Sequence, residues 1–358
     1  MKVTIIGGGY AGFNLSRLLD PHVEVTLIES RDTFVHNVAA IRAVVEPELL
    51  ERIVIPYDRL LRRGRVVHGK AVTIDADGVK LEDGSHITAD AVVVATGSQY
   101  AAPFKPQSDA TADFKAALKL VSAQIESADE IVIVGAGAVG VELAGEVKAA
   151  RPEKKVALVS DQDQLFPMYP HKLHTKLVER LVAAGVDLYL GHAAGNLKDS
   201  AAPFKGTVTL DNGKTLAGLV IPTVGARIVG SPAHQMPGIS RQPNGQLAVD
   251  QWLRPSSLAN VFAIGDLAAT GEGMTVVSTM RQAPWLAKTL RGLAQGAQLE
   301  SLRPYSRWSL PPILLPLGPK KGASVLPVAK GLVVGDGITS AIKGKKLFIP
   351  RYLKEFGR

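Results

Sequence analysis

The chain has 358 residues, which fits two or three domains, and its 46% hydrophobic and 21% charged residues are typical of a globular protein with a core. It carries a net charge of +8 and no cysteine, so disulfides, thiolate metal sites and a redox-active cysteine pair are excluded. The sequence shows no secretory signal, and its uncharged stretches fall short of the roughly 20 residues that span a bilayer. We therefore expect a soluble, cytoplasmic protein.

The chain opens with an apolar strand, residues 2–6, that ends in a glycine-rich turn of the pattern G-x-G-x-x-G. Its members are Gly7, Gly9 and Gly12, and a helical pattern follows. In such a turn the first glycine permits the tight bend, the second lets the backbone approach a pyrophosphate, and the third lets the helix pack on the strand. The N-terminus of the helix then offers free N–H groups to the phosphates. The turn therefore predicts a dinucleotide site.

The next strand, residues 25–29, ends in Glu29, which lies 17 residues beyond Gly12. A carboxylate at this place hydrogen-bonds the ribose of a bound dinucleotide, although a solvated strand end has the same pattern. His36 and Asn37 follow in a loop-like stretch near the predicted site. Asn37 fits either the N-cap of a helix that begins at Val38 or a direct contact with the cofactor, and both interpretations stay open.

A second G-x-G-x-x-G pattern follows another apolar strand, residues 130–134. It consists of Gly135, Gly137 and Gly140. One such motif is weak, but two motifs that each lie between a strand and a helix indicate two dinucleotide sites. The next strand of this unit ends in Ser160 and Asp161, with no basic residue before Lys172. Because no arginine is near to pair with a 2′-phosphate, the second site favours NADH over NADPH.

Two more apolar strands end in short turns. The first, residues 90–95, runs into Thr96 and Gly97, and the second, residues 260–264, runs into Gly265 and Asp266. Alone, each is an ordinary buried strand followed by a turn. Their significance comes from their order around the second glycine motif.

The C-terminal segment, residues 301–358, holds the excess positive charge. It contains eleven basic and two acidic residues, which leaves −1 for the first 300 residues. Apolar runs such as residues 310–316 and 347–350 lie between the charges. This combination suits the surface of an anionic membrane, and it equally suits a small folded domain with solvated lysines. We expect a folded C-terminal domain with a basic rim.

The order of these motifs resembles that of the two-dinucleotide-binding flavoproteins, the pyridine nucleotide-disulfide oxidoreductase-like family. Within the family, the chain is similar to the group of ferroptosis suppressor and apoptosis-inducing-factor-like, mitochondria-associated flavoproteins over nearly its whole length. The segments that carry this similarity are residues 34–43, 140–148, 151–156 and 342–348. The resemblance implies an α/β fold with two Rossmann-like domains of three layers (ββα) and a small C-terminal α+β domain.

The resemblance also implies a division of the chain and a set of cofactor contacts. A discontinuous FAD-binding domain would comprise residues 1–110 and 230–300, with an NAD(P)H-binding domain, residues 111–229, inserted into it. Residues 301–358 would cover the flavin and face the membrane. FAD is assigned to Gly7, Gly9, Gly12, Glu29, Asn37, Thr96, Gly97 and Asp266, NADH or NADPH to Gly135, Gly137 and Gly140, and no metal is implied.

Glu142 and Lys343 are the two candidate catalytic residues that the resemblance implies. Glu142 would lie near the nicotinamide ribose and the flavin edge and orient NADH or move a proton, although a carboxylate in a first helical turn is also favoured by the helix dipole. Lys343 would lie near the flavin, on a strand, and stabilise negative charge. Its alternative is a solvated lysine in a run with Lys345 and Lys346.

The activity implied is FAD-dependent transfer of electrons from NADH or NADPH directly to a quinone, with peripheral contact to an anionic membrane. A homodimer stays open. One alternative is a reductase of a small acidic ferredoxin or rubredoxin, which a basic docking face would also serve. The other is an apoptosis-inducing-factor-like signalling flavoprotein that binds NADH. A nucleic-acid partner is not expected, because the sequence shows no nucleic-acid-binding module or aromatic platform.

Overall fold

The first of two sheet cores is a parallel sheet of five strands. The computed structural model describes residues 1–100, 103–195, 197, 202–228, 231–328 and 331–358. The strand order in this sheet is β17-β9-β1-β2-β5. The strands are β1 (Lys2–Ile6), β2 (Glu24–Glu29), β5 (Arg65–His68), β9 (Ala91–Val94) and β17 (Val261–Ala263). β9 and β17, which come before and after residues 111–229 in the sequence, are therefore neighbours in the sheet.

This sheet is buried on both faces, so its central strands are almost entirely apolar. Side chains alternate along β1: Ile5 packs with the helices α1 (Tyr10–Leu19) and α7 (Val276–Ala294), while Ile6 packs on the opposite face. That face is covered by an antiparallel sheet of β6 (Ala71–Ile74), β7 (Gly78–Leu81) and β8 (His86–Thr88). The result is the three-layer arrangement that the resemblance implies.

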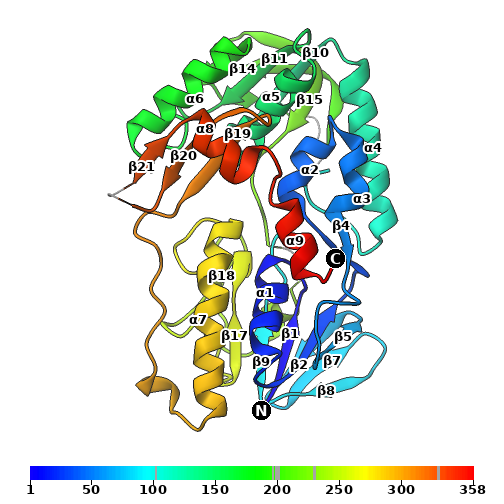
Figure 1. The fold of residues 1–358 in the computed structure, drawn as a ribbon, viewed down its shortest axis with the longest axis vertical. Helices are drawn as coiled ribbons and strands as arrows, with labels where there is room; N and C mark the ends of the chain where they lie inside the picture. The colour runs from blue at the N-terminus through cyan, green and yellow to red at the C-terminus, as the bar shows by residue number, and fades with distance from the viewer. Residues whose placement is uncertain (101–102, 196, 198–201, 229–230, 329–330) are drawn as a thin grey trace.

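The second core is a six-stranded sheet in the order β12-β11-β10-β15-β14-β13, stacked beyond the first along the long axis of the molecule (Figure 1). Its strands are β10 (Glu130–Val134), β11 (Lys155–Ser160), β12 (Val186–Leu190), β13 (Ala194–Gly195), β14 (Phe204–Leu210) and β15 (Thr215–Pro222). β10, β11, β12 and β15 run parallel. Its largest cluster of buried side chains includes those of α4 (Thr111–Ser127), α5 (Ala138–Ala150) and α6 (His171–Ala183).

The C-terminal segment packs on both cores. A three-stranded antiparallel sheet, β19 (Ile313–Leu317), β20 (Lys321–Leu326) and β21 (Leu332–Val334), lies against α5 and α6. It continues into α8 (Asp336–Thr339), the π-helical turn η5 (Ser340–Gly344) and α9 (Ile349–Glu355). Tyr352 and Phe356 at the end of the chain join an aromatic cluster with Phe13 and Phe34 of the first core.

Shorter elements connect these parts. They are β3 (Thr33–Val35), α2 (Asn37–Ala43), η1 (Pro47–Leu49), α3 (Leu50–Ile53), β4 (Val54–Pro56), η2 (Pro232–Gln235), β16 (Leu247–Ala248), η3 (Gly265–Leu267), β18 (Ala268–Ala269) and η4 (Leu299–Ser301). The α/β fold class is confirmed, whereas the exact domain limits stay a prediction. Residue 230, one of these limits, lies outside the described residues. Among the helices described, none combines the length and apolarity needed to cross a bilayer.

Candidate functional site

The two glycine motifs form turns of nearly the same geometry at the starts of α1 and α5. Gly7 and Gly135 have φ of +98° and +110°, a region that favours glycine. A Cβ on Gly12 would lie 1.8 Å from the carbonyl oxygen of Gly7, and one on Gly140 would lie 1.9 Å from that of Gly135. Each helix therefore reaches its strand only because its third glycine has no side chain.

The second glycine of each motif, Gly9 or Gly137, lies beside open space. Apart from the adjoining residues of the chain, no described atom lies within 4 Å of a Cβ built on Gly9 or on Gly137. These two residues are the N-caps of α1 and α5, and within the described chain no side chain caps either helix. The backbone N–H groups of both helices thus face open space, which fits the pyrophosphate of a dinucleotide.

Glu29, at the end of β2, is buried beside the first of these turns. Its carboxylate accepts hydrogen bonds from the backbone N–H of Gly8 and, at 3.0 Å, from that of Arg31. The Arg31 guanidinium lies 3.3 Å from the same carboxylate. The interpretation of Glu29 as a solvated strand end is therefore wrong, and its place beside the turn fits ribose binding.

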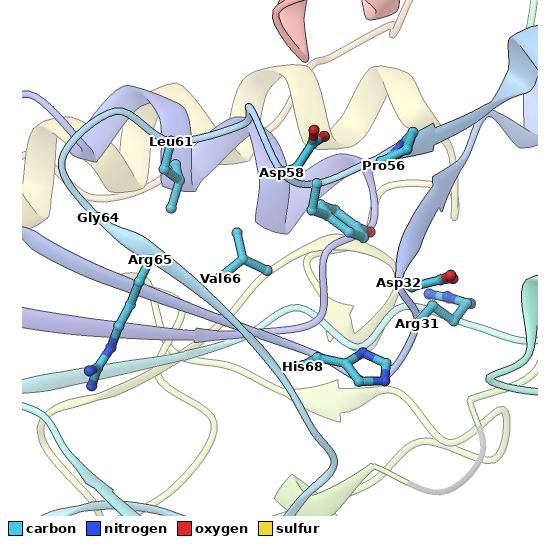
Figure 2. Close-up of a pocket in the computed structure, with 10 residues that line it drawn as sticks. Arg31, Asp32, Pro56, Asp58, Leu61, Gly64, Arg65, Val66 and His68 are labelled. Atoms are coloured by element: carbon cyan, nitrogen blue, oxygen red, sulfur yellow. The ribbon is translucent and has the colours of Figure 1, made fainter.

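A pocket of about 460 Å³ opens next to this carboxylate, along the edge strand β5 (Figure 2). Arg31, Asp32 and His68 line one end of it, and His68 pairs with Glu29 in the sheet. Tyr57 also lines the pocket and donates a hydrogen bond of 2.8 Å to the carbonyl of Gly8. Sequence reasoning missed these residues, because no motif marks them.

Asp266 lies in η3, which contacts α1, the helix that follows the first glycine turn. Its carboxylate accepts a hydrogen bond of 2.6 Å from the Ser98 hydroxyl and one of 3.0 Å from the Lys105 ammonium. Thr96 donates a 3.2 Å hydrogen bond to the Ser231 hydroxyl, and Gly97 has a φ of +71° with open space where a side chain would be. Ser98 and Lys105 were missed by the sequence analysis, since they belong to no recognisable pattern.

Glu142 and Lys343 form a buried ion pair. The Lys343 ammonium lies 2.7 and 2.8 Å from the two carboxylate oxygens of Glu142 and donates a third hydrogen bond, of 3.2 Å, to the carbonyl of Leu314. Burial raises the pKa of Glu142 to about 7, although the Lys343 ammonium opposes this shift. The pair joins α5 of the second core to the C-terminal segment.

Three expectations about these two residues are wrong. Lys343 lies in the π-helical turn η5 and not on a strand, and it is buried whereas Lys345 and Lys346 are exposed. Its hydrogen bonds, not its neighbours in the sequence, decide its environment. Glu142 is the fifth residue of α5, beyond its first turn, so the helix dipole does not account for it.

A second buried ion pair lies one helical turn further along α5. Glu146 accepts hydrogen bonds of 2.8 Å from both Nε and Nη2 of Arg42, which belongs to α2. The side chains of Arg42 and Glu146 are 4% and 2% exposed. Neither residue was singled out from the sequence.

His36 and Asn37 lie at the start of α2. His36 is fully buried, and its Nε2 lies 2.6 Å from the carbonyl of Leu347, so Nε2 carries the proton and Nδ1 accepts a 2.7 Å hydrogen bond from Tyr10. Burial lowers the pKa of His36 to about 4, which keeps it neutral. Of the two interpretations of Asn37, the N-cap is wrong: α2 begins at Asn37 itself, and its buried Oδ1 accepts no hydrogen bond from any described residue.

Comparisons with known proteins agree with this geometry. The profile of the family described as pyridine nucleotide-disulphide oxidoreductase matches residues 1–284. The chain is 32% identical to apoptosis-inducing factor homolog B of Dictyostelium discoideum, over 99% of this chain and 96% of that protein. It is 28% identical to ferroptosis suppressor protein 1 of Xenopus tropicalis, over 100% and 96%. The structure of sulfide:quinone oxidoreductase from Aquifex aeolicus has the same fold, with a TM-score of 0.75 and 19% identity over 99% of this chain and 91% of that one.

Proposed function

The chain belongs to the pyridine nucleotide-disulphide oxidoreductase family, and we propose that it passes electrons from NADH or NADPH through FAD to a quinone. It is a flavoprotein oxidoreductase whose cofactors are FAD and NADH or NADPH. Bound FAD would supply the redox chemistry, which is acceptance of a hydride from the nicotinamide and transfer of the electrons to the acceptor. Because the chain has no cysteine, it contains no thiol relay, and the acceptor has to meet the flavin itself.

The two glycine turns support separate sites for the two nucleotides. In this proposal the N-terminus of α1 binds the pyrophosphate of FAD, Glu29 hydrogen-bonds its ribose, and Asp266 hydrogen-bonds its ribityl or pyrophosphate region. Thr96, Gly97 and Asn37 complete that site, and the buried, unsatisfied Oδ1 of Asn37 is an acceptor that a cofactor N–H would use. The N-terminus of α5 receives NADH or NADPH.

The observation that carries the proposal is the buried pair of Glu142 and Lys343. A quinone takes up two protons for each pair of electrons, so its reduction needs a proton donor and a group that stabilises negative charge. The Lys343 ammonium supplies such a charge, and Glu142, whose pKa burial raises to about 7, can hold or release a proton near neutral pH. The name of one similar protein, the sulfide:quinone oxidoreductase of Aquifex aeolicus, agrees with redox chemistry of this type.

Contact with a membrane is the second part of the proposal, because lipid quinones reside there. Ile338 and Ile342, on α8 and η5, are 48% and 40% exposed, and Lys345 and Lys346 are exposed just beyond them. Apolar and basic side chains together suit the surface of an anionic membrane. The same basic face would also suit a small acidic ferredoxin or rubredoxin, which is therefore the alternative acceptor.

Anaerobic reduction of the purified flavoprotein tests the acceptor. We expect NADH to bleach the flavin absorbance and a short-chain quinone to restore it within the time of one turnover. Slow reoxidation by quinone together with fast reoxidation by an acidic ferredoxin would replace the quinone by the iron–sulfur protein.

A further inference from the structure

The two buried ion pairs lie on the same face of α5 and join three parts of the molecule. Glu142 and Glu146 are four residues apart, so their carboxylates are neighbours on the helix surface. Lys343 reaches Glu142 from the C-terminal segment, and Arg42 reaches Glu146 from α2. α2 contacts α5 directly, and η5, which carries Lys343, contacts β19, the strand that packs on α5.

Each cation is committed to one carboxylate. Nε and Nη2 of Arg42 bind the two oxygens of Glu146, which is the bidentate geometry of a guanidinium. The three donors of the Lys343 ammonium are used by the two oxygens of Glu142 and the carbonyl of Leu314. Two carboxylates this close, buried together, would otherwise compete for a single cation, because an unpaired buried charge is strongly unfavourable.

We propose that Arg42 and Glu146 are positioning residues that set the charge state of the Glu142–Lys343 pair. Arg42 balances the charge of Glu146, so the Lys343 ammonium forms its ion pair with Glu142 alone. The functional meaning of this inference rests on the proposed function, in which Glu142 exchanges a proton.

The charges around Glu142 have opposite effects on it. After burial and Lys343, the next influence is the Glu146 carboxylate, which raises the pKa of Glu142, followed by Arg42, which lowers it. Glu46 acts on Glu146 and also raises its pKa, and His36 faces Lys343 but is neutral. The charges of Arg42 and Glu146 therefore act on the pKa of Glu142 in opposite directions while both are present, and removal of one member exposes Glu142 to the other.

Titration of the Glu142 carboxyl group by carbon-13 NMR, in holoprotein labelled at glutamate, tests the inference. The Glu142→Gln variant identifies the resonance. In Glu146→Gln the uncompensated Arg42 charge should lower the midpoint of Glu142 by about one pH unit. Loss of both charges in Arg42→Gln/Glu146→Gln should bring the midpoint back to near the wild-type value. Glu146→Asp keeps the carboxylate and should shift the midpoint little.

A role in packing alone gives a different pattern: the variants would melt at lower temperature, but the Glu142 midpoint would not move. An unchanged midpoint in folded Glu146→Gln, or a double variant shifted as far as the single one, would overturn the inference. If Glu146→Gln does not fold, the exchanged pair Arg42→Glu/Glu146→Arg replaces it, and the midpoint should again fall because a cation then lies nearest to Glu142. Since the titration needs no acceptor, its result is independent of whether quinone is the substrate.

Discussion

Protonation of the Glu142 carboxyl group makes the stability of the folded protein depend on pH. Burial raises the pKa of its folded state to about 7, whereas an unfolded glutamate titrates near pH ~4.3. Between these values the folded protein keeps a proton that the unfolded chain has released, so this group's contribution to stability is complete below pH ~4.3 and is lost as the pH rises through about 7. Glu142→Gln removes the titrating group. The melting temperature of the variant relative to wild type should therefore rise across this range.

The measurement is thermal unfolding of both proteins in the same series of buffers. The offset at low pH reports the exchange of one neutral group for another, because below a pKa of about 7 the wild type has a protonated Glu142 carboxyl group beside the Lys343 ammonium and the variant has an amide there. The change of the melting-temperature difference with pH reports the release of the proton from Glu142. A melting-temperature difference that stays constant from pH ~5 to pH ~8 would contradict a proton on Glu142 in the folded protein.

The environment of single residues was predicted well only where it depends on local chemistry. The glycine turns follow from backbone sterics within six residues, and the structure has both of them with the expected geometry. Lys343 depends on Glu142, which is 201 positions away in the sequence, so its basic neighbours suggested a solvated side chain. Arg42 and Glu146 are 104 positions apart and could not be paired from one sequence.

At the scale of elements, the contact between α5 and β19 holds the C-terminal segment on the second core. Gly145 makes this contact possible, because a Cβ there would lie 2.4 Å from Cα of Leu317. Alanine normally stabilises a helix interior by up to ~1 kcal/mol over glycine. In Gly145→Ala we expect the opposite, a loss of about 1–3 kcal/mol from overpacking against a backbone that has to move.

Thermal unfolding and limited proteolysis of the link at residues 302–312 measure this effect, since a displaced β19 would expose the link. Gly337→Ala, in α8, is the matched control: no described atom lies within 4 Å of its Cβ, so it should be neutral or stabilising. Equal stability and equal cleavage of the two variants would show that the close contact does not hold the segment in place.

Elements were predicted correctly where an apolar strand leads into a glycine turn, and wrongly where tertiary contacts decide. Asn37 has a good capping side chain, but α2 already begins at Asn37, and its buried Oδ1 has no hydrogen-bond partner among the described residues. The segment around Lys343 was expected to be a strand only because of the resemblance. It forms a π-helical turn instead, because Lys343 and Leu347 both have partners in the interior.

For the whole molecule, the order of motifs was sufficient for the fold class and the family. Paired glycine motifs require two parallel sheets, and β17 returns beside β9 so that Asp266 and Thr96 lie at the same edge of the first sheet. How the C-terminal segment packs on both cores could not be predicted. It depends on an aromatic cluster formed by residues as distant as Phe13 and Phe356.

The charge of the whole molecule leads to a prediction about its surroundings. Residues 301–358 carry +9 and the remaining chain −1, so the molecule is strongly polarised. We expect Lys345→Glu/Lys346→Glu to weaken binding to vesicles that contain anionic lipid, by about 1 kcal/mol for each lysine removed, and the effect should shrink at high salt. Reduction of a water-soluble quinone should be unchanged, because both lysines are exposed and neither contacts the buried Glu142–Lys343 pair.

Lys119→Glu/Lys288→Glu serves as the control, because these exposed lysines lie on α4 and α7 and the variant has the same net charge. If binding depended on net charge alone, both double variants would lose the same affinity in vesicle sedimentation. If the basic rim beside Ile338 and Ile342 contacts the membrane, only the Lys345→Glu/Lys346→Glu variant loses affinity for the vesicles. At this place apolar insertion and charge act together. Membrane-bound quinone would then be reduced more slowly by the first variant, while soluble quinone is reduced equally by both, and this difference would identify the C-terminal segment as the part that meets the lipid.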